Sequence, residues 1–174
     1  MSEKHGHAHE SGAERVQARV LSISDRASRG VYDDVSGPAV RSLLMDAGFD
    51  VPEPDVVPDE KDVISERLRA LAAAAPLVVT TGGTGLSPRD VTPEATRAVI
   101  DYEVPGIAEL MRSAGFRKTP MAALSRALAG VRAQSLIINL PGSVKGATES
   151  LEAVVPVLQH ACGILAGSSA GHTR

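Results

Sequence analysis

Residues 80–85, which read TTGGTG, combine three glycines with three threonines at the end of a β-branched apolar run. Glycine allows the backbone to turn sharply and to present bare N–H groups to an anion, and threonine adds hydroxyl donors. The spacing matches neither a P-loop nor the glycine pattern of dinucleotide-binding folds. The segment predicts a turn that binds phosphate. A tight strand-to-helix turn without a ligand is the alternative.

Two acidic residues, Asp59 and Asp90, occupy turns that come after expected strands. In a parallel sheet such turns lie at the same edge, so the two carboxylates are expected close to the glycine-rich segment. Mg²⁺ takes one or two carboxylates together with phosphate oxygens of a substrate. Each acid could equally well cap the helix that follows it. The spacing alone leaves the metal role and the capping role open for both residues.

Two further turns carry groups that could contact a nucleotide. Ser24 follows the first expected strand, where a helix-entry turn is the favoured interpretation. Gly142 and Ser143 follow the last expected strand, and their N–H groups could hold an adenine or a ribose edge, although a plain turn fits equally well. Lys145 is interpreted as a solvated charge rather than as a phosphate contact.

The spacing of apolar residues predicts the elements that position these turns. Runs rich in β-branched residues predict buried strands, and apolar residues at i, i+3, i+4 and i+7 predict helices. Strands are expected at 18–23, 77–81 and 135–140, with an irregular or edge strand at 50–57. Helices are expected at 36–47, 59–75, from 92, at about 106–113, and at 147–165. The candidate N-caps are Ser36, Asp59 and Thr92.

Strands that alternate with helices imply an α/β fold of three layers, in which a mostly parallel central sheet has helices on both faces. Right-handed crossovers place the loops after parallel strands at one edge, and ligands of such sheets bind there. We therefore expect a ligand to bind at the loops after Ser24, Val57, Thr81 and Leu140.

Composition and charge exclude several classes of function. The chain has 174 residues, of which 43% are hydrophobic and 22% charged, as expected for a globular protein. Aromatic residues make up only 2%, which counts against stacking on single-stranded nucleic acid. The net charge of −3 counts against duplex DNA and anionic lipid as partners. Cys162, the only cysteine, lies in an apolar helical pattern and is interpreted as a buried structural thiol.

We expect one domain, residues 16–174, after a disordered polar tail of residues 1–15. The tail contains His5, His7 and His9, which are interpreted as part of a solvated segment rather than as a metal site. No stretch reaches the length of a membrane span, and the N-terminus lacks the apolar run of a signal peptide. A cytoplasmic protein that binds no membrane is expected.

Taken together, the motifs of residues 18–165 resemble the molybdopterin adenylyltransferase family of the MogA/MoaB type. The fingerprint is TTGGTG at 80–85 followed by PRDVTPEA at 88–95. Further matches come in order along the chain: SDRAS at 24–28, SGP at 36–38, VPDE at 57–60, PG at 105–106, LSR at 124–126 and NLPG at 139–142.

The resemblance implies a compact α/β fold that assembles as a homotrimer. It implies an enzyme that joins the terminal phosphate of molybdopterin to the AMP part of ATP and releases pyrophosphate, with Mg²⁺ as cofactor. Asp59 and Asp90 then correspond to the catalytic, metal-binding acids. The implied nucleotide-site residues are Ser24, Thr81, Gly82, Gly83, Thr84, Gly85, Pro141, Gly142 and Ser143. The implied residues near the pterin are Asp34, Ser36, Gly37, Ser125 and Arg126.

Residue 115 departs from the family pattern, because it is Gly115 where family enzymes often carry a serine that contacts the pterin. The chief alternative function is a non-catalytic trimer that binds molybdopterin or a nucleotide, either an inactive paralogue or a carrier. A separate molybdenum-insertion protein is an expected partner, since the chain is too short to include such a domain.

Overall fold

Six strands form one sheet in the order β2-β1-β3-β6-β5-β4 in a computed structural model that describes residues 15–167. Strands β2, β1, β3 and β6 are parallel, whereas β5 is antiparallel to β6 and β4 is antiparallel to β5. The predicted tail with its three histidines lies outside the described residues, apart from Arg15. The strands are β1 (Ala18–Ile23), β2 (Asp55–Val57), β3 (Leu77–Thr81), β4 (Tyr102–Glu103), β5 (Ala129–Arg132) and β6 (Ser135–Leu140).

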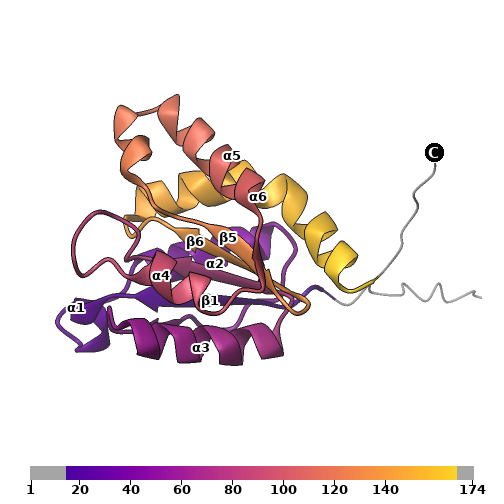
Figure 1. Cartoon of the computed structure of the whole chain (residues 1–174), viewed down its shortest axis with the longest axis horizontal. Coiled ribbons are helices and arrows are strands. Elements are labelled where there is room, and N and C mark those ends of the chain that lie inside the picture. The colour runs from indigo at the N-terminus through magenta and orange to yellow at the C-terminus, as the bar shows by residue number, and fades with distance from the viewer. Residues whose placement is uncertain (1–14, 168–174) are drawn as a thin grey trace, which may run out of the picture.

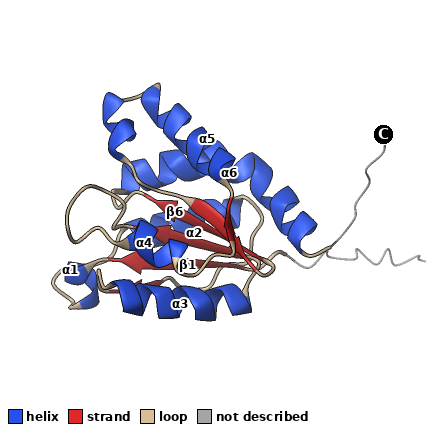
Figure 2. Cartoon of the chain, in the orientation of Figure 1, coloured by secondary structure: helices blue, strands red, loops and turns tan. Residues whose placement is uncertain are grey.

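Helices cover both faces of the sheet, which confirms the predicted three-layer α/β fold (Figures 1 and 2). One face packs against α2 (Ser36–Asp46), α5 (Pro105–Phe116) and α6 (Val144–Leu165). The other face packs against α3 (Lys61–Ala74) and α4 (Thr92–Arg97). Two short helices, α1 (Asp25–Ser28) and η1 (Pro120–Leu124), complete the set. Among residues 15–167, no helix has the length and apolar composition needed to cross a membrane.

Alternation along the strands builds one apolar core on each side of the sheet, because successive side chains of a strand point to opposite faces. In β3, Leu77 and Val79 join the core beneath α2, α5 and α6, while Val78 joins the core beneath α3 and α4. All five residues of β3 and all six of β6 are buried. This burial explains why both strands are rich in apolar and β-branched residues and show no alternation of polar and apolar positions.

The antiparallel end of the sheet was not predicted. Strand β5 contains Gly130 and ends at Arg132, and β4 is only two residues long, so neither shows an apolar run. A Cβ at Gly130 would lie 2.8 Å from the carbonyl oxygen of Tyr102, which shows how closely the two strands approach. The short helices α1 and η1 were also missed.

The caps predicted at Asp59 and Thr92 are wrong. Helix α3 has Glu60 at its cap position, and no side chain caps its amides. Helix α4 has Val91 at the cap position, and the Thr92 hydroxyl instead donates to the carbonyl of Gly82 at 2.9 Å. Both side chains point toward the loops of the sheet edge rather than along their own helices. The hydrogen bonds that the Asp59 and Thr92 side chains form instead lie in the candidate site.

Candidate functional site

The loops after four parallel strands meet at one edge of the sheet. The amide of Ser24 after β1 donates to the carbonyl of Val57 at 2.9 Å. The amide of Gly82 after β3 donates to the carbonyl of Leu140 at 3.2 Å, and the Thr81 hydroxyl donates to the carbonyl of Pro141 at 2.7 Å. These cross-links confirm that the loops predicted to share an edge are neighbours.

Two glycines of the TTGGTG segment are required by the backbone. Gly82 has φ +104°, and a Cβ there would lie 2.2 Å from the carbonyl oxygen of Ile23. Gly83 has φ +64°, and a Cβ there would lie 2.3 Å from the Thr92 hydroxyl. A side chain would therefore be strained and crowded at both positions. The glycines let the loop pass between β1 and α4.

Asp59 presents one carboxylate oxygen to this loop. Its Oδ2 accepts the amide N–H of Asp25 at 2.8 Å, while its Oδ1 lies 3.2 Å from the position that a Cβ at Gly83 would occupy. Burial is the main cause that raises the pKa of Asp59, and the charges of Asp25 and Asp90 raise it further. The hydrogen bond from Asp25 and the charge of Arg89 act in the opposite direction. Asp59 is thus a half-buried carboxylate among other carboxylates.

Asp25 is neutralised by a cation of its own. The Arg89 guanidinium donates to both carboxylate oxygens of Asp25, with Nη2 at 2.6 Å from Oδ2 and 2.8 Å from Oδ1. This pairing holds the pKa of Asp25 below its ordinary value. Arg89 therefore joins the loop after β3 to the loop after β1. Neither Asp59 nor Asp90 forms a salt bridge with any of the described residues.

Asp90 closes a turn at the far end of the same loop. Its Oδ2 accepts the amide of Ser87 at 2.9 Å, and its own amide donates to the carbonyl of Ser87 at 2.9 Å. The same oxygen lies 2.9 Å from where a Cβ at Gly85 would stand, so Gly85 makes room for the carboxylate. Asp90 caps a turn instead of helix α4 and lines the adjoining cavity.

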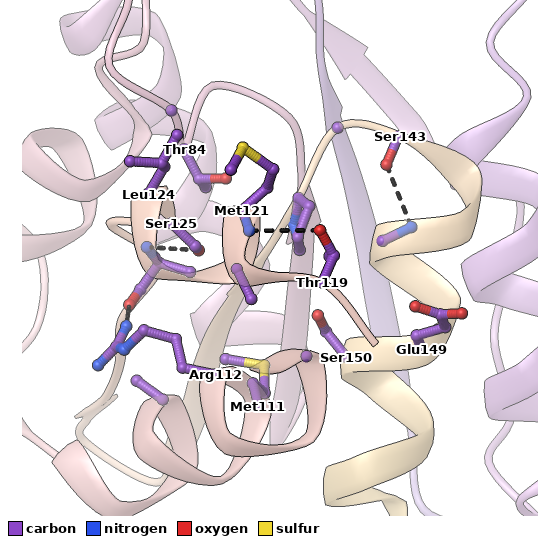
Figure 3. Close-up of a pocket in the computed structure, with 18 of the residues that line it drawn as sticks. Thr84, Met111, Arg112, Thr119, Met121, Leu124, Ser125, Ser143, Glu149 and Ser150 are labelled. Atoms are coloured by element: carbon purple, nitrogen blue, oxygen red, sulfur yellow. Dashed lines mark hydrogen bonds between the residues drawn. The ribbon is translucent and has the colours of Figure 1, made fainter. Parts of the chain in front are cut away.

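A cavity of about 440 Å³ opens beside the glycine loop, between α5 and η1 on one side and α6 on the other (Figure 3). It is lined by six of the predicted nucleotide-site residues, by Asp90 and by Ser125 of the predicted pterin end. The six are Gly83, Thr84, Gly85, Pro141, Gly142 and Ser143. This volume matches that of a small-molecule site.

Three predicted nucleotide-site residues shape the loops without lining the cavity. Ser24 caps the short helix α1 by accepting the amide of Ala27 at 3.2 Å. Thr81 and Gly82 are buried and bond the glycine loop to the end of β6, and Gly82 packs closely against Ile23 of β1.

The predicted pterin residues Asp34, Ser36 and Gly37 form a separate group at the start of α2. Asp34 Oδ1 accepts the amide of Gly37 and the hydroxyl of Ser36, both at 3.2 Å, and Oδ2 accepts the buried hydroxyl of Ser22. The predicted cap at Ser36 is therefore wrong, and Asp34 supplies the side-chain acceptor in its place. None of the three lines the cavity.

Arg126, also predicted near the pterin, donates hydrogen bonds to the loop that carries Asp90. Its Nε donates to the carbonyl of Gly85 at 2.7 Å, and its Nη2 donates to the carbonyl of Asp90 at 2.5 Å. Its Nη1 pairs with Glu94 and holds the pKa of that carboxyl below its ordinary value.

Apart from Gly115, the residues of the outer wall of the cavity were missed by sequence reasoning. Figure 3 shows Met111 and Arg112 of α5, Thr119 and Met121 by η1, and Ser150 of α6 around it. These side chains carry no shared motif, and they come together only because α5 and α6 pack side by side. Their sequence therefore contained no signal for the site.

Gly115 lies in this wall, where it lets η1 approach α5. A Cβ at Gly115 would lie 2.7 Å from the Cβ of Ala122, so a side chain there would push η1 outward. Gly115 is thus matched to the close packing of Ala122.

The acids fit a magnesium ion only if a substrate completes the shell. Mg²⁺ favours carboxylate and phosphate oxygens in an octahedral shell. Asp59 Oδ1 faces the bare backbone of Gly83, and Asp90 lines the cavity nearby. Among residues 15–167, no group of three or more His, Cys, Asp or Glu side chains is arranged to hold a metal. The donor set therefore suits a cation that arrives with phosphate oxygens.

Comparisons with known proteins agree on one family. Residues 19–160 match the family described as "Probable molybdopterin binding domain". The chain is 45% identical over 157 residues to the molybdopterin adenylyltransferase of Helicobacter pylori strain J99, covering 88% of this chain and 89% of that protein. It is 46% identical over 140 residues to the enzyme of the same name from Escherichia coli K12, covering 78% and 71%.

Solved structures extend the likeness to the fold. The molybdopterin biosynthesis enzyme MoaB from Thermus thermophilus superposes with a TM-score of 0.83 at 53% identity, over 88% of this chain and 98% of that one. The Mog protein from Mycobacterium ulcerans superposes with a TM-score of 0.82 at 38% identity, over 90% of this chain and 100% of that one.

Proposed function

Because the chain belongs to the family of probable molybdopterin-binding domains, we propose that it is a molybdopterin adenylyltransferase in the synthesis of the molybdenum cofactor. The proposed reaction joins the terminal phosphate of molybdopterin to the α-phosphorus of ATP and releases pyrophosphate. One P–O bond forms, and the bond between the α- and β-phosphates breaks. A family relative at 45% identity over most of both chains supports the activity.

One structural observation supports this proposal independently of the similarity to known enzymes. Asp59 and Asp90 lie beside the backbone of Gly83 and Gly85, and neither forms a salt bridge with a described residue. Two such carboxylates next to a phosphate-binding turn would repel ATP. A divalent cation that binds with the nucleotide offsets this repulsion, because it accepts oxygens from both the acids and the phosphates. The arrangement is therefore consistent with a magnesium-dependent nucleotide reaction.

Asp59 and Asp90 would hold Mg²⁺, which when bound would neutralise the negative charge that builds up on the phosphate oxygens. The N–H groups of the glycine loop would donate to those oxygens and hold the α-phosphorus in line with the attacking phosphate. That phosphate is already anionic, so the chain has no proton to remove from it. Positioning and charge neutralisation supply the acceleration.

We place the reacting ends of both substrates in this cavity. We place the nucleotide against Thr84, Gly142 and Ser143, where backbone amides and hydroxyls line the sheet edge. We place the pterin in the part between α5, η1 and α6, with Ser125 at the junction. Asp34, Ser36 and Gly37 do not line this cavity. We therefore propose that they stabilise the start of α2 and make no direct contact with substrate.

Pyrophosphate release tests the activity directly. Purified protein is incubated with molybdopterin, ATP and Mg²⁺, and released pyrophosphate is measured. The proposal predicts release that needs all three components and stops when EDTA removes the metal. Tight binding of molybdopterin without any release would instead support the non-catalytic alternative.

A further inference from the structure

The loop that carries Asp90 is closed at its base and irregular beyond it. At the base, the amide of Thr92 donates to the carbonyl of Gly83 at 3.1 Å, and its hydroxyl donates to the carbonyl of Gly82 at 2.9 Å. Residues 84–91 beyond the base contain no helix or strand. Their backbone therefore depends on other contacts to keep one conformation.

Arg126 supplies those contacts to both limbs of the loop. On the outgoing limb, its amide donates to the carbonyl of Thr84 at 2.9 Å, and its Nε donates to the carbonyl of Gly85 at 2.7 Å. On the returning limb, its Nη2 donates to the carbonyl of Asp90 at 2.5 Å. One residue thus fixes the distance between the two limbs.

Glu94 fixes the guanidinium in turn. Its carboxylate accepts from both terminal nitrogens of Arg126, and Glu94 itself lies in the first turn of α4. Because a guanidinium is planar and delocalised, it can serve two carbonyls and one carboxylate at the same time, whereas the ammonium group of lysine is a single point charge. The contacts use most of the five N–H donors of Arg126.

We propose that Arg126 is a positioning residue that holds Asp90 and the glycine loop in their working geometry, rather than a residue that contacts the pterin. The proposal rests on the proposed function, because Asp90 is assigned as a metal ligand there. Residues that support metal ligands typically change metal affinity by about 10- to 100-fold when they are replaced. Arg126 acts on Asp90 through the backbone carbonyl of that residue.

The test compares Arg126→Lys and Arg126→Gln with wild type in the absence of turnover. Binding of Mn²⁺ together with ATP is measured by electron paramagnetic resonance, and hydrogen exchange is measured at the amides of residues 85–91. We expect Mn²⁺ affinity to fall by about 10- to 100-fold and exchange in this loop to become faster. Molybdopterin affinity is expected to stay close to that of wild type, because Arg126 does not line the cavity in which the pterin is placed.

Arg41 offers a matched control. It donates to the carbonyls of Val51 and Pro52 at 3.0 and 3.1 Å and pairs with Glu53, but it lies on α2 away from the glycine loop. Arg41→Gln removes the same kinds of contact and should leave Mn²⁺ affinity and exchange at 85–91 unchanged.

Unchanged exchange at residues 85–91 in both Arg126 variants would overturn the proposal, whatever happens to molybdopterin affinity. If Arg126→Gln does not fold, Arg126→Lys keeps the charge opposite Glu94 and carries the same comparison. Neither Mn²⁺ binding nor exchange needs catalysis. A wild-type protein that releases no pyrophosphate would therefore refute the proposed function while leaving the role of Arg126 to be decided by these readouts.

Discussion

Asp25 and Asp59 hold each other by reciprocal hydrogen bonds. The amide of Asp25 donates to Asp59 Oδ2 at 2.8 Å, and the amide of Asp59 donates to Asp25 Oδ1 at 3.1 Å. The two residues are 34 positions apart and join the loops after β1 and β2. This lock turns Asp59 Oδ1 toward Gly83, and Arg89 neutralises the charge of Asp25 from outside.

Replacing Asp59 by asparagine should separate stability from activity. The pKa of Asp59 is raised in the folded state, so its stabilising contribution is present below the ordinary pKa and is lost as pH rises through the raised value. At pH 7 the ionised side chain therefore opposes folding. Asp59→Asn should melt at or above the wild-type temperature while losing about 100- to 1,000-fold in turnover, as expected for loss of a group that stabilises developing charge. A clearly lower melting temperature with normal turnover would contradict the metal role.

Gly82→Ala should destabilise the fold strongly. The residue has φ +104°, and the new Cβ would lie 2.2 Å from the carbonyl oxygen of Ile23. The backbone conformation alone costs about 1–2 kcal/mol for a residue with a side chain, and the clash adds to this. Urea unfolding should show a loss above about 2 kcal/mol. Gly106→Ala is the control, because nothing lies within 4 Å of its Cβ position, and it should be close to neutral.

Gly115→Ser should disturb the pterin end of the cavity. The added Cβ would lie 2.7 Å from that of Ala122, so η1 must move away from α5. We expect weaker molybdopterin binding with unchanged Mn²⁺–ATP binding. The double variant Gly115→Ser, Ala122→Gly removes the colliding methyl group and should recover most of the affinity. No difference between the single and double variants would show that this contact does not shape the site.

Cys162 should resist thiol reagents in the folded protein. Its side chain is 2% exposed, and burial raises its pKa to about 11 from the ordinary 9.0. The thiolate that reacts is therefore scarce and shielded at a mildly alkaline pH.

The same thiol makes stability depend on pH. Because the pKa of Cys162 is higher in the folded state, its stabilising contribution is present below pH 9 and is lost as pH rises toward 11. Stability should fall by up to about 1.4 kcal/mol per pH unit in that window. Cys162→Ala should lack this part of the decline.

A strand could be predicted from the sequence only where its signal lies within its own residues. Strands β3 and β6 are rich in β-branched and apolar residues and are bounded by proline or glycine turns, so they were predicted with their boundaries. Strand β5 is interrupted by Gly130, and its pairing with β6 comes from tertiary contacts, so it was missed.

The same distinction applies to the site. The TTGGTG segment, Asp59 and Asp90 were predicted as neighbours from the topology of a parallel sheet alone. Which way each side chain turns could not be predicted, because it depends on partners far away in sequence. Asp59 is turned by Asp25, and Arg126 is drawn to Gly85 and Asp90 by contacts across 41 and 36 positions.

The most direct test of the central claim measures pyrophosphate release by wild type, Asp90→Asn and Asp55→Asn with molybdopterin, ATP and Mg²⁺. Asp55 pairs with Arg67 between β2 and α3 and serves as the matched control. We predict release by wild type and by Asp55→Asn, and about 100- to 1,000-fold less by Asp90→Asn with its fold intact. Full activity of Asp90→Asn would contradict the assignment of this carboxylate to the reaction.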